Sequence, residues 1–384
     1  MNMPPLGMYL LNAFLIVVVI IPLLQRNAAR LGLLDLPKGR KMHDGAIPLT
    51  GGIAMFAAFL VPAMNLQLVL GAGWELIAGL GILVALGVAD DAFDINPWMK
   101  LCGQAAAAAI MTVPHANFLQ LGQIVGSEAA IPAFLALPLT IFFIVGIINA
   151  FNMIDGLDGL AGGAAATALA WIVFAAWLSG APNAVAEPML ILFAVLGFLI
   201  FNLRHRWRPR ASVFMGDAGS MMLGGAIAFF AIRLALPAAE GQPSSAVPPL
   251  PAILWFFALP AFDTLLLIAR RLADGQNPLV GDRRHLHHLL LQAGLPPERA
   301  TAGVIAANGV LGGIGFAGWQ LGMSGEVMAA ALALPLLMHG YFVCRGWRHL
   351  QRLLLRETPS AEVAQFPADA FPGEAFTTVR DRAA

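Results

Sequence analysis

The chain has 384 residues, of which 59% are hydrophobic and 11% are charged, and its formal net charge is +0. Soluble domains carry about 25% charged residues, and the apolar residues here come in long runs rather than in alternation. The composition therefore excludes an ordinary soluble domain. Nothing in it indicates a nucleic-acid partner.

Eleven apolar segments follow one another along the chain, and a helix needs roughly 20 apolar residues to cross a bilayer. Backbone groups in lipid must be hydrogen-bonded internally, and these runs are too long and uniformly apolar for barrel strands. The sequence predicts an all-α polytopic membrane protein with about eleven transmembrane helices. The segments are residues 6–24, 50–70, 74–93, 98–113, 132–151, 157–179, 188–203, 217–236, 250–269, 301–321 and 325–344.

The positions of Lys and Arg predict the orientation of these helices. If the N-terminus lies outside, every Lys and Arg except Arg233 falls in an inner segment. The positive-inside rule therefore predicts an inner-membrane protein with its N-terminus outside and its C-terminus in the cytoplasm. We expect residues 1–356 to form one transmembrane domain and residues 357–384 to form a mobile cytoplasmic tail.

Carboxylates gather at predicted inner helix ends, so separate loops bring them to one membrane face. Asp90 and Asp91 lie in VADDAFD, and Asp217 lies in VFMGDAGS. Adjacent carboxylates at a membrane edge repel each other and favour a hard cation such as Mg²⁺. The alternatives are a solvated turn for the Asp90–Asp91 pair and a helix N-cap for Asp217.

A second polar group occurs in NAFNMIDGLDGL, between the fifth and sixth segments. Asn149, Asn152, Asp155 and Asp158 recur every three residues, and such positions share one face of a helix. Amides and carboxylates together suit the donor and acceptor edges of a nucleotide or sugar. A helix-linking turn with caps is the alternative.

Two arginines precede three histidines in GDRRHLHHLLLQAGL, the last predicted inner loop with a motif. His285, His287 and His288 suggest zinc, but no cysteine accompanies them, and Arg283 and Arg284 lie beside them. Cations next to phosphate are favourable, whereas cations next to a metal are not. We therefore prefer phosphate contact over zinc, with a solvent-exposed basic loop as the remaining alternative.

Basic residues also occur in the first inner loop and in the fourth segment. Arg40, Lys41 and His43 either follow the positive-inside rule or hold a lipid phosphate. Lys100 shares a helix face with Gln104, and it either snorkels to the interface or faces the Asp90–Asp91 pair.

Carboxylates for a metal, basic groups for phosphates and amides for a base or sugar thus lie on one side of the membrane. Phosphoryl transfer requires this combination of positioning, metal and charge neutralisation. The sequence predicts a cytoplasmic active-site cleft.

Five motifs in a fixed order give this sequence a resemblance to a known family. It resembles the polyprenyl-phosphate N-acetylhexosamine-1-phosphate transferases, which are also called glycosyltransferase family 4. The His-Leu-His-His sequence is similar to the bacterial branch that uses UDP-N-acetylglucosamine (UDP-GlcNAc) and undecaprenyl phosphate. The motifs cover about residues 35 to 295: DLPKGRKMHDGAIPLTGG, VADDAFD, NAFNMIDGLDGL, VFMGDAGS and DRRHLHHLLLQAGL.

The resemblance implies roles at the reacting centre. Asp217 resembles the ligand of Mg²⁺, for which Mn²⁺ is a substitute, and Asp91 resembles the residue that assists it. Asp90 resembles the base or anchor for the polyprenyl phosphate. Phe214 resembles the aromatic residue that stacks on uracil, and Lys100 resembles a phosphate-facing lysine.

The resemblance also implies roles for the two polar loops. The Asn152, Asp155 and Asp158 side chains resemble a nucleoside- and sugar-facing stripe, and the three histidines resemble a diphosphate-facing loop. One departure is the basic stretch RHRWRPR, residues 204–210, which is longer than in the sister translocase branch and puts a nucleotide contact by Asn202 in doubt.

The expected reaction is transfer of GlcNAc-1-phosphate from UDP-GlcNAc to undecaprenyl phosphate, with release of UMP. It would begin a cell-surface polysaccharide such as O-antigen, common antigen or teichoic acid. Another UDP-sugar is the first alternative, and a secondary transporter is the second, although transporters place such groups near the midplane of repeated halves. A homodimer is compatible with either reading.

Overall fold

Apolar helices make up almost the whole structure, a computed structural model that describes residues 6–36, 45–65, 74–112, 133–180, 184–236, 247–277 and 284–357. The described residues of each of the eleven predicted apolar segments are mostly helical. Within the described residues, eight helical stretches are long and apolar enough to cross a membrane, and α2, α5 and α9 are shorter. The predicted all-α polytopic membrane fold is confirmed, and the predicted tail lies outside the described residues except for its first residue.

The N-terminal part of the chain supplies the acidic motifs. Its elements are α1 (Leu6–Asn27), β1 (Leu34–Asp35), β2 (Ile47–Pro48), α2 (Gly51–Asn65), α4 (Trp74–Phe93), α5 (Pro97–Thr112), α7 (Ala133–Ile154), α8 (Leu160–Leu178), α9 (Ala186–Asn202) and α10 (Gly216–Ala235).

The C-terminal part supplies the histidine motif and the last helices of the bundle. Its elements are α11 (Leu250–Leu254), the 3₁₀ turn η4 (Trp255–Phe257), α12 (Ala258–Ala273), α13 (Leu286–Gln292), α14 (Pro297–Gln320), α15 (Gly325–Ala331), α16 (Ala333–Tyr341), the π turn η5 (Phe342–Gly346) and α17 (Trp347–Glu357).

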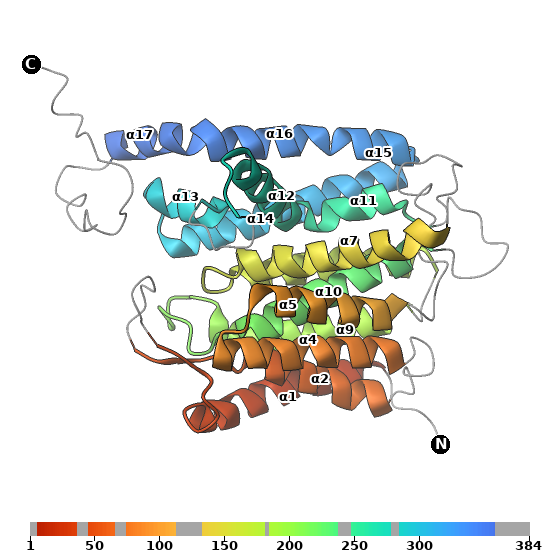
Figure 1. The fold of residues 1–384 in the computed structure, drawn as a ribbon, viewed down its shortest axis with the longest axis vertical. Coiled ribbons are helices and arrows are strands. Elements are labelled where there is room, and N and C mark those ends of the chain that lie inside the picture. Colours follow the sequence, from red (N-terminus) through yellow and green to blue (C-terminus); the bar gives the residue numbers. More distant parts are fainter. Residues whose placement is uncertain are drawn as a thin grey trace, which may run out of the picture.

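Most helices lie side by side, with axes that are nearly parallel or antiparallel (Figure 1). Helix α10 lies at the centre, where almost all of its side chains are buried against α4, α7, α2 and α8. Small residues allow this close packing, as is common where membrane helices meet. A Cβ atom at Gly87 of α4 would overlap the backbone of Ala218 of α10.

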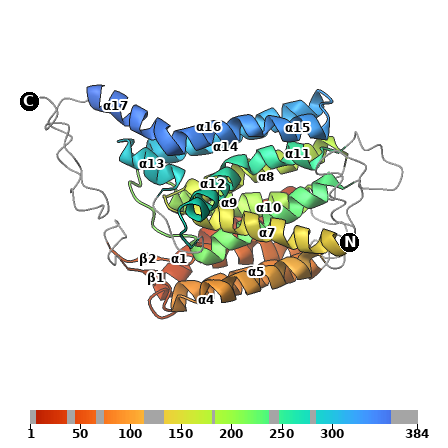
Figure 2. The same cartoon turned by 45° about the horizontal axis from the view of Figure 1, so that its top comes forward.

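The span predicted over residues 250–269 is broken rather than continuous. The 3₁₀ turn η4 separates α11 from α12, and Phe257 has non-helical angles of φ −135° and ψ 28°. The Asn308 amide of α14 donates a hydrogen bond of 3.0 Å to the Phe256 carbonyl oxygen that the break leaves free. Helix α12 therefore crosses its neighbours steeply (Figures 1 and 2).

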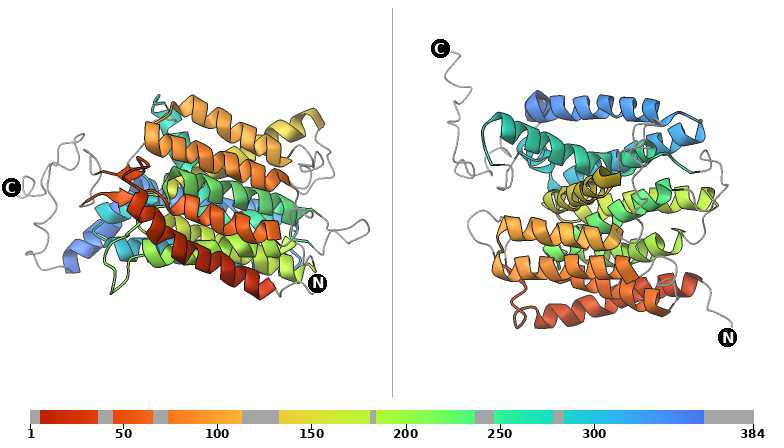
Figure 3. Two further views of the ribbon diagram at one scale, coloured as in Figure 1. Left: turned by 90° about the horizontal axis from the view of Figure 1, so that it is seen from below. Right: turned by 45° about the vertical axis from the view of Figure 1, so that its right-hand side comes forward.

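Short polar elements gather at one end of the bundle. Strands β1 and β2 and helices α13 and α17 all lie there (Figure 2), and the two further views keep them at that end (Figure 3). The short hairpin pairs Leu34 with Pro48 and Asp35 with Ile47. The Phe214 N–H donates to the Pro48 carbonyl at 2.9 Å, so strand β2 is joined to the segment that precedes α10.

Close packing of α4 on α10 generates a stability prediction. We expect Gly87→Ala to lower the free energy of unfolding by about 1–3 kcal/mol, because the added methyl group overpacks a backbone contact. Gly81→Ala on the same helix is the matched control, since its Cβ atom would lie 3.4 Å from the Phe56 ring, an ordinary contact distance. Thermal unfolding in detergent measures both, and equal melting temperatures would contradict the proposed packing.

Candidate active site

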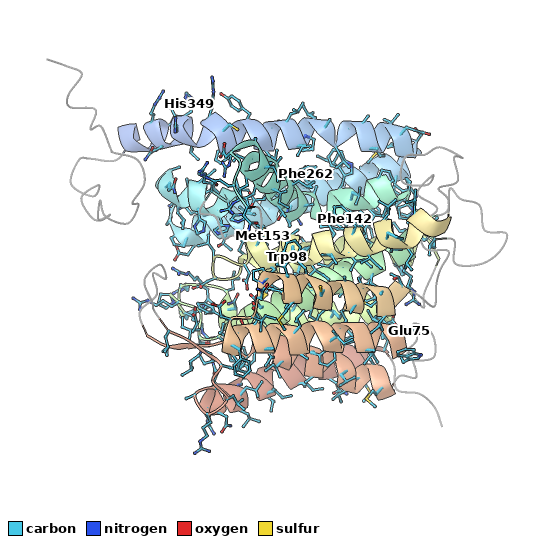
Figure 4. The ribbon with its side chains drawn as sticks, in the orientation of Figure 1. Glu75, Trp98, Phe142, Met153, Phe262 and His349 are labelled. Atoms are coloured by element: carbon cyan, nitrogen blue, oxygen red, sulfur yellow. The ribbon has the colours of Figure 1, made fainter. Side chains whose placement is uncertain are left out.

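One ammonium group joins carboxylates from two helices at the polar end of the bundle. Lys100 Nζ of α5 lies 2.8 Å from Asp90 Oδ2 of α4 and forms a second ion pair with Asp217 of α10. It also donates to Asn152 Oδ1 of α7 at 3.4 Å. The structure thus resolves the predicted alternatives for Lys100: it faces the acidic pair. Trp98 and Met153, labelled in Figure 4, mark this region on α5 and α7.

Asp217 is held from several sides at the start of α10. Its Oδ1 accepts a hydrogen bond of 2.9 Å from the Asn152 amide, and its backbone N–H donates to Asp91 Oδ1 at 3.1 Å. The N-cap of α10 is Met215, without a side-chain cap. The N-cap alternative for Asp217 is therefore wrong, and its carboxylate points into the cluster.

Glycine allows Asp91 to approach this helix start closely. Gly216 has φ +67°, which L side chains rarely adopt, and a Cβ atom there would overlap the Asp91 carboxylate. Asp91 Oδ2 is buried and has no hydrogen-bond partner among the described residues. An unsatisfied buried carboxylate oxygen is costly, so this atom indicates a position for a cation or a donor.

The Asp90 carboxylate also shapes the turn between α4 and α5. Its Oδ1 accepts a hydrogen bond of 3.1 Å from the Ile95 N–H, while Asp94 adopts φ +51°, a left-handed conformation that aspartate tolerates. The adjacent pair is thus engaged on both sides and is no solvated turn.

The donor set fits Mg²⁺. The ion prefers one or two carboxylates and takes its other oxygens from substrate phosphates and water. Asp91 and Asp217 supply those carboxylates beside the unsatisfied Asp91 oxygen. Among the described residues no group of three or more His, Cys, Asp or Glu side chains forms a metal site by itself, so the remaining ligands of the ion would come from the substrate and water.

The polar stripe predicted from NAFNMIDGLDGL divides into separate contacts because α7 ends at Ile154. The single helix face expected for its four residues is therefore wrong. Asn152 faces Asp217, whereas Asn149 lies one turn deeper and donates to Gln104 Oε1 at 2.7 Å. The sequence places Gln104 on one helix face with Lys100, but it does not predict the contact of Gln104 with Asn149.

Asp155 and Asp158 lie in the loop between α7 and α8. Burial first, and then the nearby Asp217 and Asp91 carboxylates, raise the pKa of Asp155 well above its usual range. Asp158 Oδ2 accepts 2.7 Å and 3.0 Å hydrogen bonds from Arg204 Nε and the Ala211 N–H. Asp158 therefore holds two loops together, and its predicted substrate contact stays a prediction.

Asn202 makes a similar connection. Its Oδ1 accepts a hydrogen bond of 2.8 Å from the Gly159 N–H, and its amide donates to the Val213 carbonyl at 2.9 Å. Both ends of this buried side chain are occupied by backbone groups. A nucleotide contact by Asn202 is therefore disfavoured, because both polar groups of its side chain already bind the backbone.

The histidine motif is organised by a residue that the sequence did not reveal. His285 Nδ1 lies 2.8 Å from Asp263 Oδ2 of α12, and the Leu286 N–H donates to Asp263 Oδ1 at 2.9 Å. His339 Nε2 of α16 approaches the same carboxylate at 3.3 Å. Asp263 is the one acidic residue in the apolar segment 250–269. The residues that contact it lie far from it in the chain, so the sequence does not predict this cluster.

His287 and His288 continue this cluster toward the loop after α7. Their ring centroids are 4.2 Å apart, and the His287 ring lies against Gly156, where a Cβ atom would overlap its Nε2. His287 is buried, and neither of its ring nitrogens has a hydrogen-bond partner among the described residues. The histidines thus contact the loop that contains Asp155.

Several predicted residues lie elsewhere or outside the described residues. Phe214 directly precedes the Asp217 helix start, and its carbonyl accepts from the Gly51 N–H at 3.0 Å. Arg284 is exposed and pairs with Asp274 at 3.5 Å. Outside the described residues lie Arg40, Lys41, His43 and Arg283.

Known proteins resemble this chain over nearly its whole length. Residues 74–235 match the family described as glycosyl transferase family 4. An undecaprenyl-phosphate alpha-N-acetylglucosaminyl 1-phosphate transferase of Salmonella typhi is 33% identical over 350 residues, which is 88% of this chain and 91% of the relative. The proteins with this name from Escherichia coli K12 and Haemophilus influenzae are also 33% identical, over 91% and 88% of this chain and 94% and 93% of their own lengths.

The buried His287 ring generates a pH prediction. Burial, and then the neighbouring His288 and His285, lower the pKa of His287 to about 3, whereas an unfolded histidine titrates near about 6.5. Between these values the unfolded chain binds a proton that the folded chain does not, so stability falls as pH decreases. When the pH is lowered from about 7.5 to about 5.5, the free energy of unfolding of the wild type should fall. We expect it to fall by about 1 kcal/mol less in His287→Phe, because this variant has no ring to protonate at residue 287.

Thermal unfolding across this pH range measures the difference. His349→Phe, at an exposed position on α17 (Figure 4), is the control and should follow the wild type. Parallel pH profiles for the wild type and His287→Phe would contradict the buried, neutral state of His287.

Proposed function

Because this chain belongs to the polyprenyl-phosphate N-acetylhexosamine-1-phosphate transferases of glycosyl transferase family 4, we propose that it transfers GlcNAc-1-phosphate from UDP-GlcNAc to undecaprenyl phosphate. The products are undecaprenyl-diphosphate-GlcNAc and UMP. The observation that carries the proposal for the site is the meeting of Asp90, Asp217 and Asn152 at the Lys100 ammonium.

The reaction exchanges one phosphoanhydride for another. A phosphate oxygen of the lipid attacks the β-phosphorus of UDP-GlcNAc in line, a new P–O bond forms, and the bond to the UMP oxygen breaks. Little covalent chemistry is left for the protein, so its contribution is positioning and charge neutralisation.

Lys100 neutralises charge on the phosphates in this scheme. Its ammonium already lies between the Asp90 and Asp217 carboxylates, where a diphosphate would exchange with one of them. Asp91 and Asp217 would hold Mg²⁺, or Mn²⁺ in its place, which when bound withdraws charge from the diphosphate. Asn152 keeps the Asp217 carboxylate oriented through its hydrogen bond.

Asp90 is the residue that we assign to the lipid phosphate, as its anchor or as the acceptor of its proton. It lies at the end of α4, next to the exposed Phe93, Trp98 and Met99 of the α4–α5 turn. Such an apolar margin suits a lipid substrate whose charged head must reach a partly buried ammonium.

The nucleotide and sugar would bind beside the Asp155 loop and the histidines. Phe214 is proposed to stack on uracil, and Asp155 and His287 are proposed to face the sugar and diphosphate. Arg284 would stand at the margin of this region, with Arg283, Arg40, Lys41 and His43 as further phosphate contacts from the two loops that the structure does not describe.

We place the site on the cytoplasmic face of a bacterial inner membrane, with the N-terminus outside and the C-terminus inside. The positive-inside distribution supports this orientation. The product would begin a cell-surface polysaccharide of the O-antigen, common-antigen or teichoic-acid type. The homodimer stays a prediction.

Release of UMP by purified protein tests the proposal. With undecaprenyl phosphate and Mg²⁺ we expect UMP from UDP-GlcNAc, and not from UDP-N-acetylgalactosamine, a UDP-deoxy-amino sugar or UDP-MurNAc-pentapeptide. Asp217→Asn should lower the rate by about 100-fold or more, because it weakens both the metal site and the Lys100 ion pair.

Asp94→Asn is the matched control. It makes the same chemical change at an exposed turn position where asparagine also tolerates the left-handed conformation, so the rate should stay near that of the wild type. UMP release only with another UDP-sugar would keep the chemistry and overturn the substrate. Full activity of Asp217→Asn would overturn the assigned site.

A further inference from the structure

The basic stretch after α9 has no role in the proposed reaction. We call residues 203–211 the arginine loop: it contains four arginines and one tryptophan, and no acidic residue. Arg204 turns inward and pairs with Asp158 at 2.7 Å. Arg206 and Arg208 have no acidic partner among the described residues, although they lie at the same end of the bundle as the acidic cluster.

The arginine loop continues the lipid-facing side of α9. Leu196 and Ile200 lie one helical turn apart, and they are 40% and 43% exposed, as expected for side chains that face lipid. Arg208 Nη1 donates a hydrogen bond of 3.0 Å to the Ile200 carbonyl, directly at the end of that face. The loop extends beyond the helix ends, in light green in Figure 1. It therefore lies where the hydrocarbon region gives way to the headgroups.

The backbone of the loop is held in a tight turn before any ligand binds. His205 and Arg208 exchange backbone hydrogen bonds of 2.9 and 2.8 Å, which close a tight turn around Arg206 and Trp207. The Arg206 guanidinium lies 4.9 Å from the centroid of the Trp207 ring, and Arg208 lies over Phe201. A turn fixed in this way loses little conformational freedom on binding.

Trp207 is 79% exposed, so most of its ring surface faces away from the protein. Tryptophan is enriched at membrane–water interfaces, where its ring lies at headgroup level, and arginines there attract anionic lipids. A ring and two cations together match that environment better than they match bulk solvent.

We propose that the arginine loop binds the headgroups of anionic phospholipids, with the Arg206 and Arg208 guanidinium groups on the lipid phosphates and the Trp207 ring at the interface. The continuity with the lipid-facing side of α9 favours a lipid over a soluble protein or a nucleic acid. This surface is separate from the Lys100 cluster, and the proposal does not rest on the transferase activity.

Native mass spectrometry of the full chain, released from neutral detergent with phosphatidylglycerol or phosphatidylcholine, tests the proposal. We expect phosphatidylglycerol to bind in preference to phosphatidylcholine. Each arginine near an anionic surface contributes about fivefold in affinity, so Arg206→Gln with Arg208→Gln should weaken phosphatidylglycerol binding by about tenfold or more. High salt should weaken it as well.

Two further variants keep the test decisive. Arg206→Lys with Arg208→Lys retains the charges and should retain most of the binding, which separates loss of charge from loss of fold. Arg299→Gln with Arg345→Gln removes two exposed arginines elsewhere and should bind phosphatidylglycerol like the wild type. Equal losses in the glutamine pair and this control would show an effect of net charge alone and overturn the proposal.

Glycerol phosphate is the competitor that distinguishes a lipid from a small phosphate ligand. We expect it to leave the bound lipid in place, because it lacks the apolar part that the Trp207 ring and the α9 face would contact. Displacement of phosphatidylglycerol by glycerol phosphate, or no preference over phosphatidylcholine, would overturn the assignment.

Discussion

Carboxyl groups packed at the end of an apolar helix bundle are the constraint on which the rest of this structure depends. Partly buried charges lose much of their hydration and persist only when they are paired and hydrogen-bonded. Here Lys100, Asn152 and the backbone N–H of Asp217 supply those partners from three different helices. Two carboxylates share this ammonium, and the third, Asp91, has an oxygen without a partner among the described residues, which leaves room for a second cation that a diphosphate would bring with it.

This arrangement requires helices to approach one another more closely than ordinary side chains allow. Gly87 and Gly216 remove the Cβ atoms that would separate α4 from the start of α10, so Asp91 reaches the Asp217 backbone. The histidine cluster depends in addition on a break in a helix. The break at η4 tilts α12 and carries Asp263 to His285 and His339.

The sequence predicted the fold well because each apolar run must become a helix in lipid, and the described residues of all eleven predicted segments are mostly helical. It also brought Asp90 and Lys100 together as one alternative, since they lie ten residues apart across one turn. The three-residue spacing predicted one helix face for four residues: Asn149, Asn152, Asp155 and Asp158. This prediction is wrong, because the helix ends at Ile154. Asp263 was missed because its partners come from α13 and α16, and periodicity carries no information on such distant contacts.

The central claim is that Asp91 and Asp217, beside Lys100, form a cation site that a nucleotide diphosphate completes. Electron paramagnetic resonance of Mn²⁺ added to the purified chain tests it most directly, because the signal of free Mn²⁺ is lost on binding. The account predicts weak binding without nucleotide, a clear increase with UDP-GlcNAc, and no increase in Asp217→Asn. An equal increase in Asp217→Asn, or no effect of UDP-GlcNAc on the wild type, would contradict it.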